Sequence, residues 1–374
     1  MTHRMPRRSL SPLLFCCIFS GSALAASPAI RDLAKLPVDR PLGPAEQKVI
    51  ADYVASRLEQ LRSAKTLQQV QKARKALSDG YRVHPDSVYY QLAYAKHVAV
   101  GAGRLLSLRG DPLRPVKELH LGMAVAVMPQ YEIQPALVAM SKHSSPAVRY
   151  WAAKGYRRAG RRILMMGGEH ARTMTATLER MGLKESSGPV LGEVLQALGP
   201  YRDIGGNEAK ALLAALDHVW SARINGLRDG RAEAVAAYRR SLGVIVRLQS
   251  RDLKAALQLA ADVMEAASLA LKAAKSAKAD QAESVEMLKD TLLLVERYIG
   301  EMLQVRSRPI QGVLADQKKS PEERRILVRL KALNFWWPKL TAKGVRRRVK
   351  PVPTTGPATT RPTGSRPARS GPAK

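Results

Sequence analysis

Apolar residues recur at intervals of three and four positions over most of the chain. This spacing gathers apolar side chains on one face of an α-helix, so it predicts helices. The first three such runs are Val49, Ile50, Tyr53, Val54, Leu58 and Leu61; then Leu67, Val70, Ala73 and Leu77; then Val88, Leu92, Ala95 and Val100. No stretch of the sequence alternates apolar and polar residues for long enough to predict a strand. The pattern therefore predicts an all-α protein.

Proline and glycine divide this pattern into segments. Residues 26–43 contain Pro28, Pro37, Pro41 and Gly43, and they are predicted to form an extended linker. Helices are predicted from residue 44 onward, with a break at residues 109–115.

Residues 134–160 follow a helix–turn–helix pattern. A short helix over residues 134–140 leads into a turn at Ser144-Ser145-Pro146. Ser145 is placed as an N-cap, and Pro146 stands in the first helical turn. Gly160 is predicted to end this second helix. Its inward stripe is predicted at Val148, Ala152, Tyr156 and Ala159.

The same pattern returns 41 to 42 residues later along the chain. The corresponding residues are Ser144 and Ser186, Val148 and Val190, Leu137 and Leu178, and Met140 and Met181. A period of this length lies in the range of HEAT and armadillo repeats.

Residues 130–200 resemble HEAT-repeat proteins. The second helix of that family typically opens with a small polar residue and a proline, followed by Val-Arg and an alanine-rich stretch. Ser145-Pro146, Val148-Arg149 and Ala152-Ala153 match this pattern, whereas the second copy has Leu191 in place of the motif's arginine. Residues 44–129 match only as generic helices. The resemblance implies an α-solenoid, and we expect a HEAT-like domain over residues 44–204.

Residues 205–340 are predicted to form a helical bundle. Their apolar positions follow heptad steps of four and three. These positions are Leu257, Ala260, Met264, Ala267, Leu271 and Ala274, and then Val285, Leu288, Leu292, Val295, Ile299 and Met302. Two interpretations of residues 251–305 stay open. We favour an antiparallel hairpin, because Asp280 and Glu283 are placed like a capping box. One continuous helix is the alternative, because Lys278 and Gln281 keep the heptad phase.

Residues 1–25 have the pattern of an export signal. Arg4, Arg7 and Arg8 precede an apolar stretch that is too short to span a bilayer. Ala23-Leu24-Ala25 then fits the small-x-small rule for signal cleavage. We therefore expect an exported protein, periplasmic or secreted, that is cleaved after Ala25. The general secretory and twin-arginine routes both stay open.

The remaining composition limits the chemistry of the expected mature protein. Cys16 and Cys17 are the only cysteines, and both lie inside the expected signal. A mature chain without cysteine has no disulfide, no thiol nucleophile and no cysteine-ligated metal. Residues 341–374 are rich in Pro, Thr, Gly, Arg and Lys, and they are predicted to be a disordered basic tail.

The net charge of the chain is +31. Three of these positive charges lie in residues 1–25 and ten in residues 338–374, which leaves +18 on residues 26–337. A folded body with this excess attracts polyanions through its long-range field and through counterion release. The competing interpretation is that the charge reflects a generally arginine-rich proteome and that the protein has no specific anionic partner.

In the predicted repeats, the densest group of cations lies in the second helix of the first repeat. No carboxylate occurs between Ala136 and Gly168 to neutralise them locally. They form a candidate anion-binding patch, unless acids from neighbouring helices neutralise it. The candidate residues are Arg149, Lys154, Arg157, Arg158, Arg161 and Arg162.

A second candidate surface adjoins the predicted tail. Trp336 and Trp337 are followed by Arg346, Arg347 and Arg348, a composition suited to an anionic membrane surface. The competing interpretation is that both tryptophans pin the last helix to the core.

No known catalytic or cofactor motif is recognisable in the sequence. The histidines after the signal show no familiar metal spacing, and no nucleotide-binding loop or nucleophile motif occurs, so we expect no metal and no cofactor. We therefore expect a non-enzymatic scaffold that binds a protein or anionic polymer of the cell envelope, with peripheral contact to an anionic membrane as a further possibility and no specific nucleic-acid motif. The alternative is a helical envelope enzyme, acting for example on a polysaccharide, with an unrecognised active site.

Overall fold

The computed structural model describes residues 28–106, 110–231, 236–274 and 279–348. All regular secondary structure in these ranges is helical, which confirms the all-α prediction. The helices of the first part are α1 Pro28–Ala34, α2 Pro44–Ser63, α3 Leu67–Tyr81, α4 Val88–Leu105, α5 Arg114–Val125, α6 Gln134–Ser141, α7 Pro146–Met166, α8 Gly168–Lys184 and α9 Gly188–Leu198, with a 3₁₀ turn, η1, at Tyr131–Ile133. The second part has α10 Gly206–Arg228, α11 Ala236–Gln249, α12 Leu253–Ala273, α13 Ala279–Leu303, α14 Pro309–Ala315, α15 Pro321–Lys331, the π-helical turn η2 Ala332–Trp336, and α16 Trp337–Thr341.

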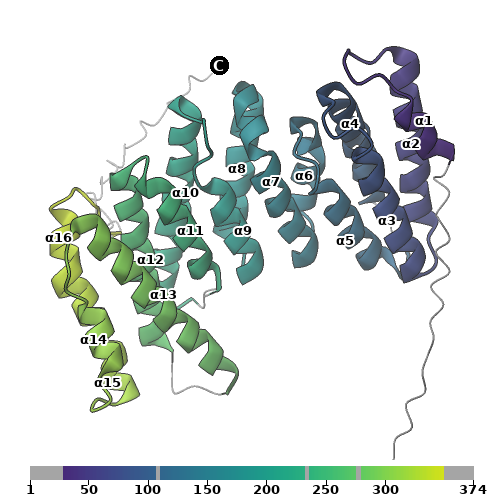
Figure 1. Ribbon diagram of the computed structural model, residues 1–374. Helices are drawn as coiled ribbons and strands as arrows, with labels where there is room; N and C mark the ends of the chain where they lie inside the picture. The colour runs from purple at the N-terminus through teal and green to yellow at the C-terminus, as the bar shows by residue number, and fades with distance from the viewer. Residues whose placement is uncertain (1–27, 107–109, 232–235, 275–278, 349–374) are drawn as a thin grey trace, which may run out of the picture.

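These helices stack into two layers that together form an arch (Figure 1). In one layer α2, α4, α6, α8, α10 and α12 pack in that order, and in the other α3, α5, α7, α9, α11 and α13 do the same. Most of these helices therefore contact their neighbours in the sequence as well as the next helix of their own layer. At the far end, α15 and α16 pack on α12, and α14 packs on α13.

The core lies between the two layers, at the positions that the apolar spacing predicts. Val148, Ala152 and Tyr156 of α7 are all fully buried, as predicted. Val190 of α9 is buried at the same place in the next helix pair, 42 residues after Val148. Val148 of α7 and Val190 of α9 are thus buried at corresponding positions, while the HEAT-like repeat itself stays a prediction.

Gly160 does not end α7, which continues to Met166. The glycine is buried, and a Cβ at this position would clash with the phenol of Tyr201 and with Met174. Gly160 therefore allows Tyr201 and Met174 to pack closely against α7, and it does not end the helix.

Part of the predicted linker is folded. Residues Pro28–Ala34 form α1, which packs on α2, and Leu33 is fully buried. The carbonyl of Leu33 lies 2.8 Å from Nε2 of His84, and Ser87 Oγ donates to the carbonyl of Val38. The described part of this proline-containing segment is therefore docked on the helices, and residues 1–27, which include the expected signal, lie outside the described residues.

The second half continues the stacking of the first. Helix α10 packs on α8 and α9, so the boundary predicted at residue 205 corresponds to no break in packing. Residues 253–303 form two helices that pack side by side, which favours the hairpin over one continuous helix. Within the described part of the chain, no helix is long and apolar enough to cross a membrane.

The described C-terminal segment extends past the boundary predicted at residue 341. Residues 342–344 form a turn in which Gly344 has φ +75°, and Val345 is buried. Residues 345–348 then continue without regular secondary structure and contact Asp217 of α10 and Gln258 and Asp262 of α12. We call residues 345–348 the strap, and the rest of the predicted tail lies outside the described residues.

Candidate anion-binding site

Arg149, the first predicted anion ligand, is held by a buried carboxylate. Its Nε donates to Oε2 of Glu185 at 2.7 Å, and its Nη2 donates to Oε1 at 2.9 Å. The Glu185 side chain is only 2% exposed, whereas that of Arg149 is 20% exposed. Burial raises the pKa of Glu185, but the hydrogen bond and charge of Arg149 outweigh it and lower the pKa. The pair is therefore ionised and bidentate.

The arginines further along α7 are exposed and partly neutralised. Arg157 lies 2.9 Å from the buried carboxylate of Glu193, which also pairs with Arg240 of α11 at 3.1 Å. Arg161 pairs with the exposed Asp203 at 3.2 Å. These acids come from the following helix pair, so they support the interpretation of a ridge neutralised by neighbouring helices.

The remaining candidates on α7 make short-range contacts of other kinds. Arg158 donates to the carbonyl of Ala126 at 3.2 Å. The ammonium of Lys154 lies 4.5 Å from the ring centroid of Trp151, a cation–π contact. Arg162 is half-buried, with one guanidinium nitrogen that has no hydrogen-bond partner among the described residues. The six predicted cations therefore do not converge on one binding site.

A basic pocket lies at the start of this ridge, between α6, α7 and α8. Its volume is about 350 Å³. It is lined by Ser141, Lys142, His143, Arg149, Thr177, Arg180, Met181, Lys184 and Glu185. We call it the α6–α8 pocket. Arg149 is the only predicted candidate that lines it.

Three cations of this pocket have no acidic partner. No carboxylate in the described ranges lies within 4 Å of the charged nitrogens of Lys142, Arg180 or Lys184, and all three residues are exposed. The one acid in the lining, Glu185, is already paired with Arg149. The pocket therefore carries a local excess of three positive charges, and its chemistry suits an anion.

Local structure explains why these cations gather there. Lys142 follows the last residue of α6, and Lys184 is the last residue of α8. The carbonyl end of a helix is the negative end of its dipole and favours cations. Arg180 and Lys184 are four residues apart, so they share a face of α8. This i, i+4 pair is the signal by which the sequence could have revealed the site.

The second predicted surface is folded inward. Trp336 is fully buried and donates from Nε1 to Glu296 at 2.8 Å. Trp337 is 5% exposed and donates to Glu265 at 3.2 Å. Both indoles therefore pin the C-terminal helices to the core, which corrects the hypothesis that they anchor the protein at a membrane.

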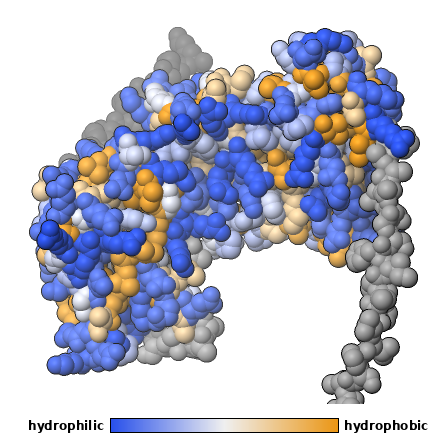
Figure 2. Space-filling view, viewed as in Figure 1, coloured by the Kyte–Doolittle hydropathy of each residue, from blue (hydrophilic) through white to orange (hydrophobic). Residues whose placement is uncertain are grey.

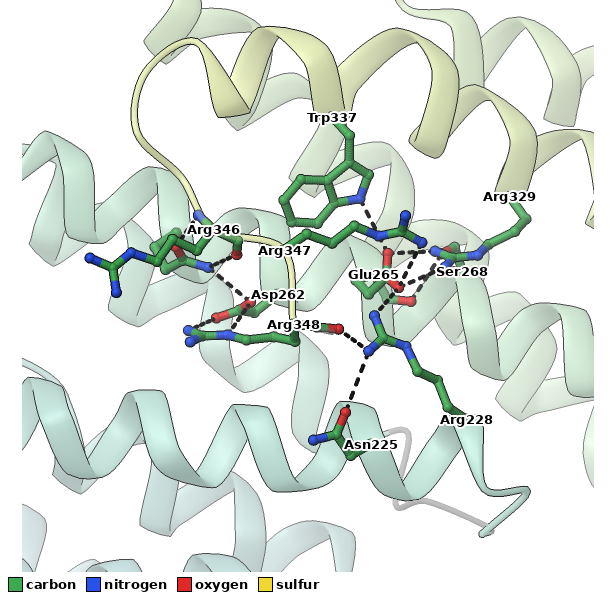
Figure 3. A network of polar contacts seen from close by, with 11 residues as sticks. Asn225, Arg228, Asp262, Glu265, Ser268, Arg329, Trp337, Arg346, Arg347 and Arg348 are labelled. Atoms are coloured by element: carbon green, nitrogen blue, oxygen red, sulfur yellow. Dashed lines mark hydrogen bonds and ion pairs between the residues drawn. The ribbon is translucent and has the colours of Figure 1, made fainter. Parts of the chain in front are cut away.

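The arginines beside these tryptophans also bind acids of the folded body (Figure 3). Arg348 donates to Asp262 from Nε at 3.1 Å and from Nη2 at 2.8 Å, and its side chain is 12% exposed. Arg347 lies 3.8 Å from the buried Glu265, while Arg346 is exposed and hydrogen-bonds through its backbone. Arg347 and Arg348 are therefore largely engaged within the protein rather than at a membrane surface.

The face of the arch shown in Figure 2 is largely hydrophilic over its middle helices. In the ranges that the structure describes, no group of three His, Cys, Asp or Glu residues is arranged to hold a metal ion. No protein-family model matches this chain, and no curated protein sequence matches it significantly.

Proposed function

We propose that this protein is an exported helical scaffold that binds an anionic polymer of the cell envelope through its basic surface. The observation that carries the proposal is the α6–α8 pocket, where Lys142, Arg180 and Lys184 lie without acidic partners. The pocket provides the local contacts, and the net charge of +28 that remains on residues 26–374 without the three signal arginines provides the long-range attraction.

A polymer suits this arrangement better than a single small anion. The arginines Arg157, Arg158 and Arg161 lie further along α7, and all three stay exposed although Arg157 and Arg161 are paired with acids. A chain of repeating phosphate, sulfate or carboxylate groups can contact the pocket and this ridge together. Each contact would release counterions, so the affinity would fall steeply with salt.

The test removes the three unpaired cations of the pocket and keeps the fold. The variant Lys142→Gln, Arg180→Gln, Lys184→Gln is compared with Lys72→Gln, Lys96→Gln, Lys210→Gln, which removes the same charge from exposed sites on α3, α4 and α10. Binding to heparin, used as a probe polyanion, is measured in 0.1 M salt. We expect the pocket variant to lose at least tenfold in affinity and the control variant to lose less than threefold.

Equal losses in the two variants would contradict a specific site and leave only a diffuse basic surface. The export half of the proposal has its own test. N-terminal sequencing of the protein recovered from its natural compartment should begin at Ala26, whereas a sequence that begins at Met1 would contradict export with cleavage.

A further inference from the structure

The strap is held in a groove between α10 and α12 by both its backbone and its side chains. Gln258 of α12 accepts a hydrogen bond from the backbone N–H of Arg346 at 2.8 Å and donates to the carbonyl of Arg346 at 2.9 Å. The amide side chain of Gln258 thus hydrogen-bonds to both the backbone N–H and the backbone C=O of Arg346. This pairing uses only the backbone groups of Arg346, so it requires no particular side chain there.

Arg348 provides the side-chain recognition. Its guanidinium bridges Asp262 of α12 and Asp217 of α10. The Asp262 carboxylate is 2% exposed, whereas that of Asp217 is 49% exposed. Two carboxylates on adjacent helices therefore form a fork-shaped acceptor that matches the planar donors of an arginine.

A cavity of about 260 Å³ lies beside this arginine site. Asp217, Gln258 and Asp262 line it together with the apolar side chains of Leu213, Ala214, Leu216, Trp220, Leu248, Ala255 and Leu259. Trp220 is 1% exposed, and its indole N–H has no hydrogen-bond partner among the described residues. The strap therefore leaves unfilled apolar space and an unpaired buried donor next to its own binding site.

We infer that the α10–α12 groove is a recognition site for an extended, arginine-bearing segment of a partner protein, and that the strap occupies it in cis. Gln258 would hold the backbone of the incoming segment, the pair of aspartates would hold its arginine, and the adjacent cavity would accept an apolar side chain. Binding of the partner would then release the strap and the basic residues that follow it.

The attachment of the strap explains how such an exchange can be controlled. A tethered segment competes at an effective concentration in the millimolar range. A partner must therefore bind more tightly than the strap, and filling the cavity beside Trp220 is one way to do so. Gly344, with φ +75°, forms the turn between α16 and the strap, so the strap can leave without unfolding of α16.

The test uses a labelled peptide with the sequence of residues 344–350, Gly-Val-Arg-Arg-Arg-Val-Lys. Its binding is measured by fluorescence anisotropy with the full-length protein and with the full-length Arg348→Ala variant, in which the cis competitor is weakened. We expect the variant to bind the peptide at least tenfold more tightly than the unmodified protein. Adding Asp262→Asn to the variant should abolish this gain. Residues 26–374 carry a net charge of +28, which disfavours non-specific binding of a basic peptide.

A matched peptide separates arginine recognition from simple charge. It carries Lys in place of Arg348, and it should bind at least fivefold more weakly because an ammonium cannot bridge two carboxylates bidentately. Equal binding of the two peptides, or equal binding by the protein with and without Asp262→Asn, would overturn the inference.

One measurement on the unmodified protein keeps the test independent of variant folding. Hydrogen exchange in millimolar peptide should become faster at residues 345–348 and should stay slow in α10 and α12. Unchanged exchange in the strap would contradict displacement. A dimer that forms with rising concentration and is lost in Arg348→Ala would also overturn the inference, because the second copy's strap would then be the occupant.

Discussion

Arg149 of α7 and Glu185, which follows α8, form a bidentate ion pair between residues that are 36 positions apart in the chain. The same arginine donates to the carbonyls of His143 and Ser144, and the same carboxylate accepts from the backbone N–H of Ser187. One ion pair thus ties the turn before α7 to the turn before α9. The arginine that marks the repeat pattern is therefore a structural link between two neighbouring turns.

Removing Arg149 should destabilise the protein more than removing an exposed arginine from the same helix. Arg149→Ala leaves the Glu185 carboxylate buried without its partner, and we expect a loss of about 2–4 kcal/mol in the free energy of unfolding. Arg161 and Asp203 are 48% and 59% exposed, so Arg161→Ala should cost less than about 1 kcal/mol. Urea denaturation of both variants measures the difference, and equal values would contradict the role assigned to the buried pair.

The same substitution at two adjacent positions of α7, Ala147 and Val148, should have very different effects on stability. Val148 is fully buried, so Val148→Asp places an unpaired carboxylate in the core and should cost at least about 4 kcal/mol. Ala147 is exposed in the first turn of the helix, where an acid interacts favourably with the helix dipole. Ala147→Asp should therefore leave the melting temperature within a few degrees. A similar loss in both variants would show that the expected inward face is wrong.

The apolar spacing predicted the helices and the buried faces because both depend on nearby residues in the chain. Val148 and Val190 are buried as their positions in the pattern required. The charges were less predictable, because the partners of Arg149 and Arg157 come from the next helix pair in the stack. The run of arginines without local acids therefore predicted an unpaired patch. In the folded protein, acids that are distant in the sequence pair with several of these arginines.

The two ends of the chain also show the limits of composition. The composition predicts an extended linker at residues 26–43 and a disordered tail at residues 341–374. However, Leu33 and Val345 are buried against the helices. Single apolar residues in a polar context can dock when a preformed groove receives them, and the sequence alone does not show that groove. The α6–α8 pocket is only partly predictable, because the sequence spacing pairs Arg180 with Lys184 while helix packing brings Lys142 to the same pocket.

Two truncations should differ in stability by the contribution of the strap. A chain that ends at residue 348 keeps Val345 in the core and Arg348 on Asp262, and it should melt within about 2 °C of the full-length protein. A chain that ends at residue 340 loses both contacts and leaves Asp262 buried without its partner. We expect its melting temperature to fall by about 5 °C or more. Identical melting temperatures for the two truncations would contradict docking of the strap.

Acid should destabilise the C-terminal helices through Glu265. Burial raises the pKa of Glu265, but hydrogen bonds and charge from Arg329, together with Arg228 and Arg347, lower it to about 2. Because the folded pKa lies below the unfolded value, this stabilisation is complete above about pH 4.5 and is lost as the pH falls from there toward 2.

The variant Glu265→Gln isolates this effect. The difference in unfolding free energy between it and the unmodified protein should shrink by about 3 kcal/mol between pH 5 and pH 2. The measurement is urea denaturation at a series of pH values. A difference that does not change with pH would contradict the assignment of the low pKa to Glu265.

The salt dependence of polyanion binding tests the central proposal most directly. The slope of log K against log salt concentration reports how many counterions the bound cations release, at roughly 0.7–0.9 per contact. For heparin, the Lys142→Gln, Arg180→Gln, Lys184→Gln variant should show a slope that is shallower by about 2 than that of the unmodified protein. The control variant at Lys72, Lys96 and Lys210 should keep the original slope. A pocket variant with an unchanged slope would show that the α6–α8 pocket does not contact the polymer, and it would contradict the proposed function.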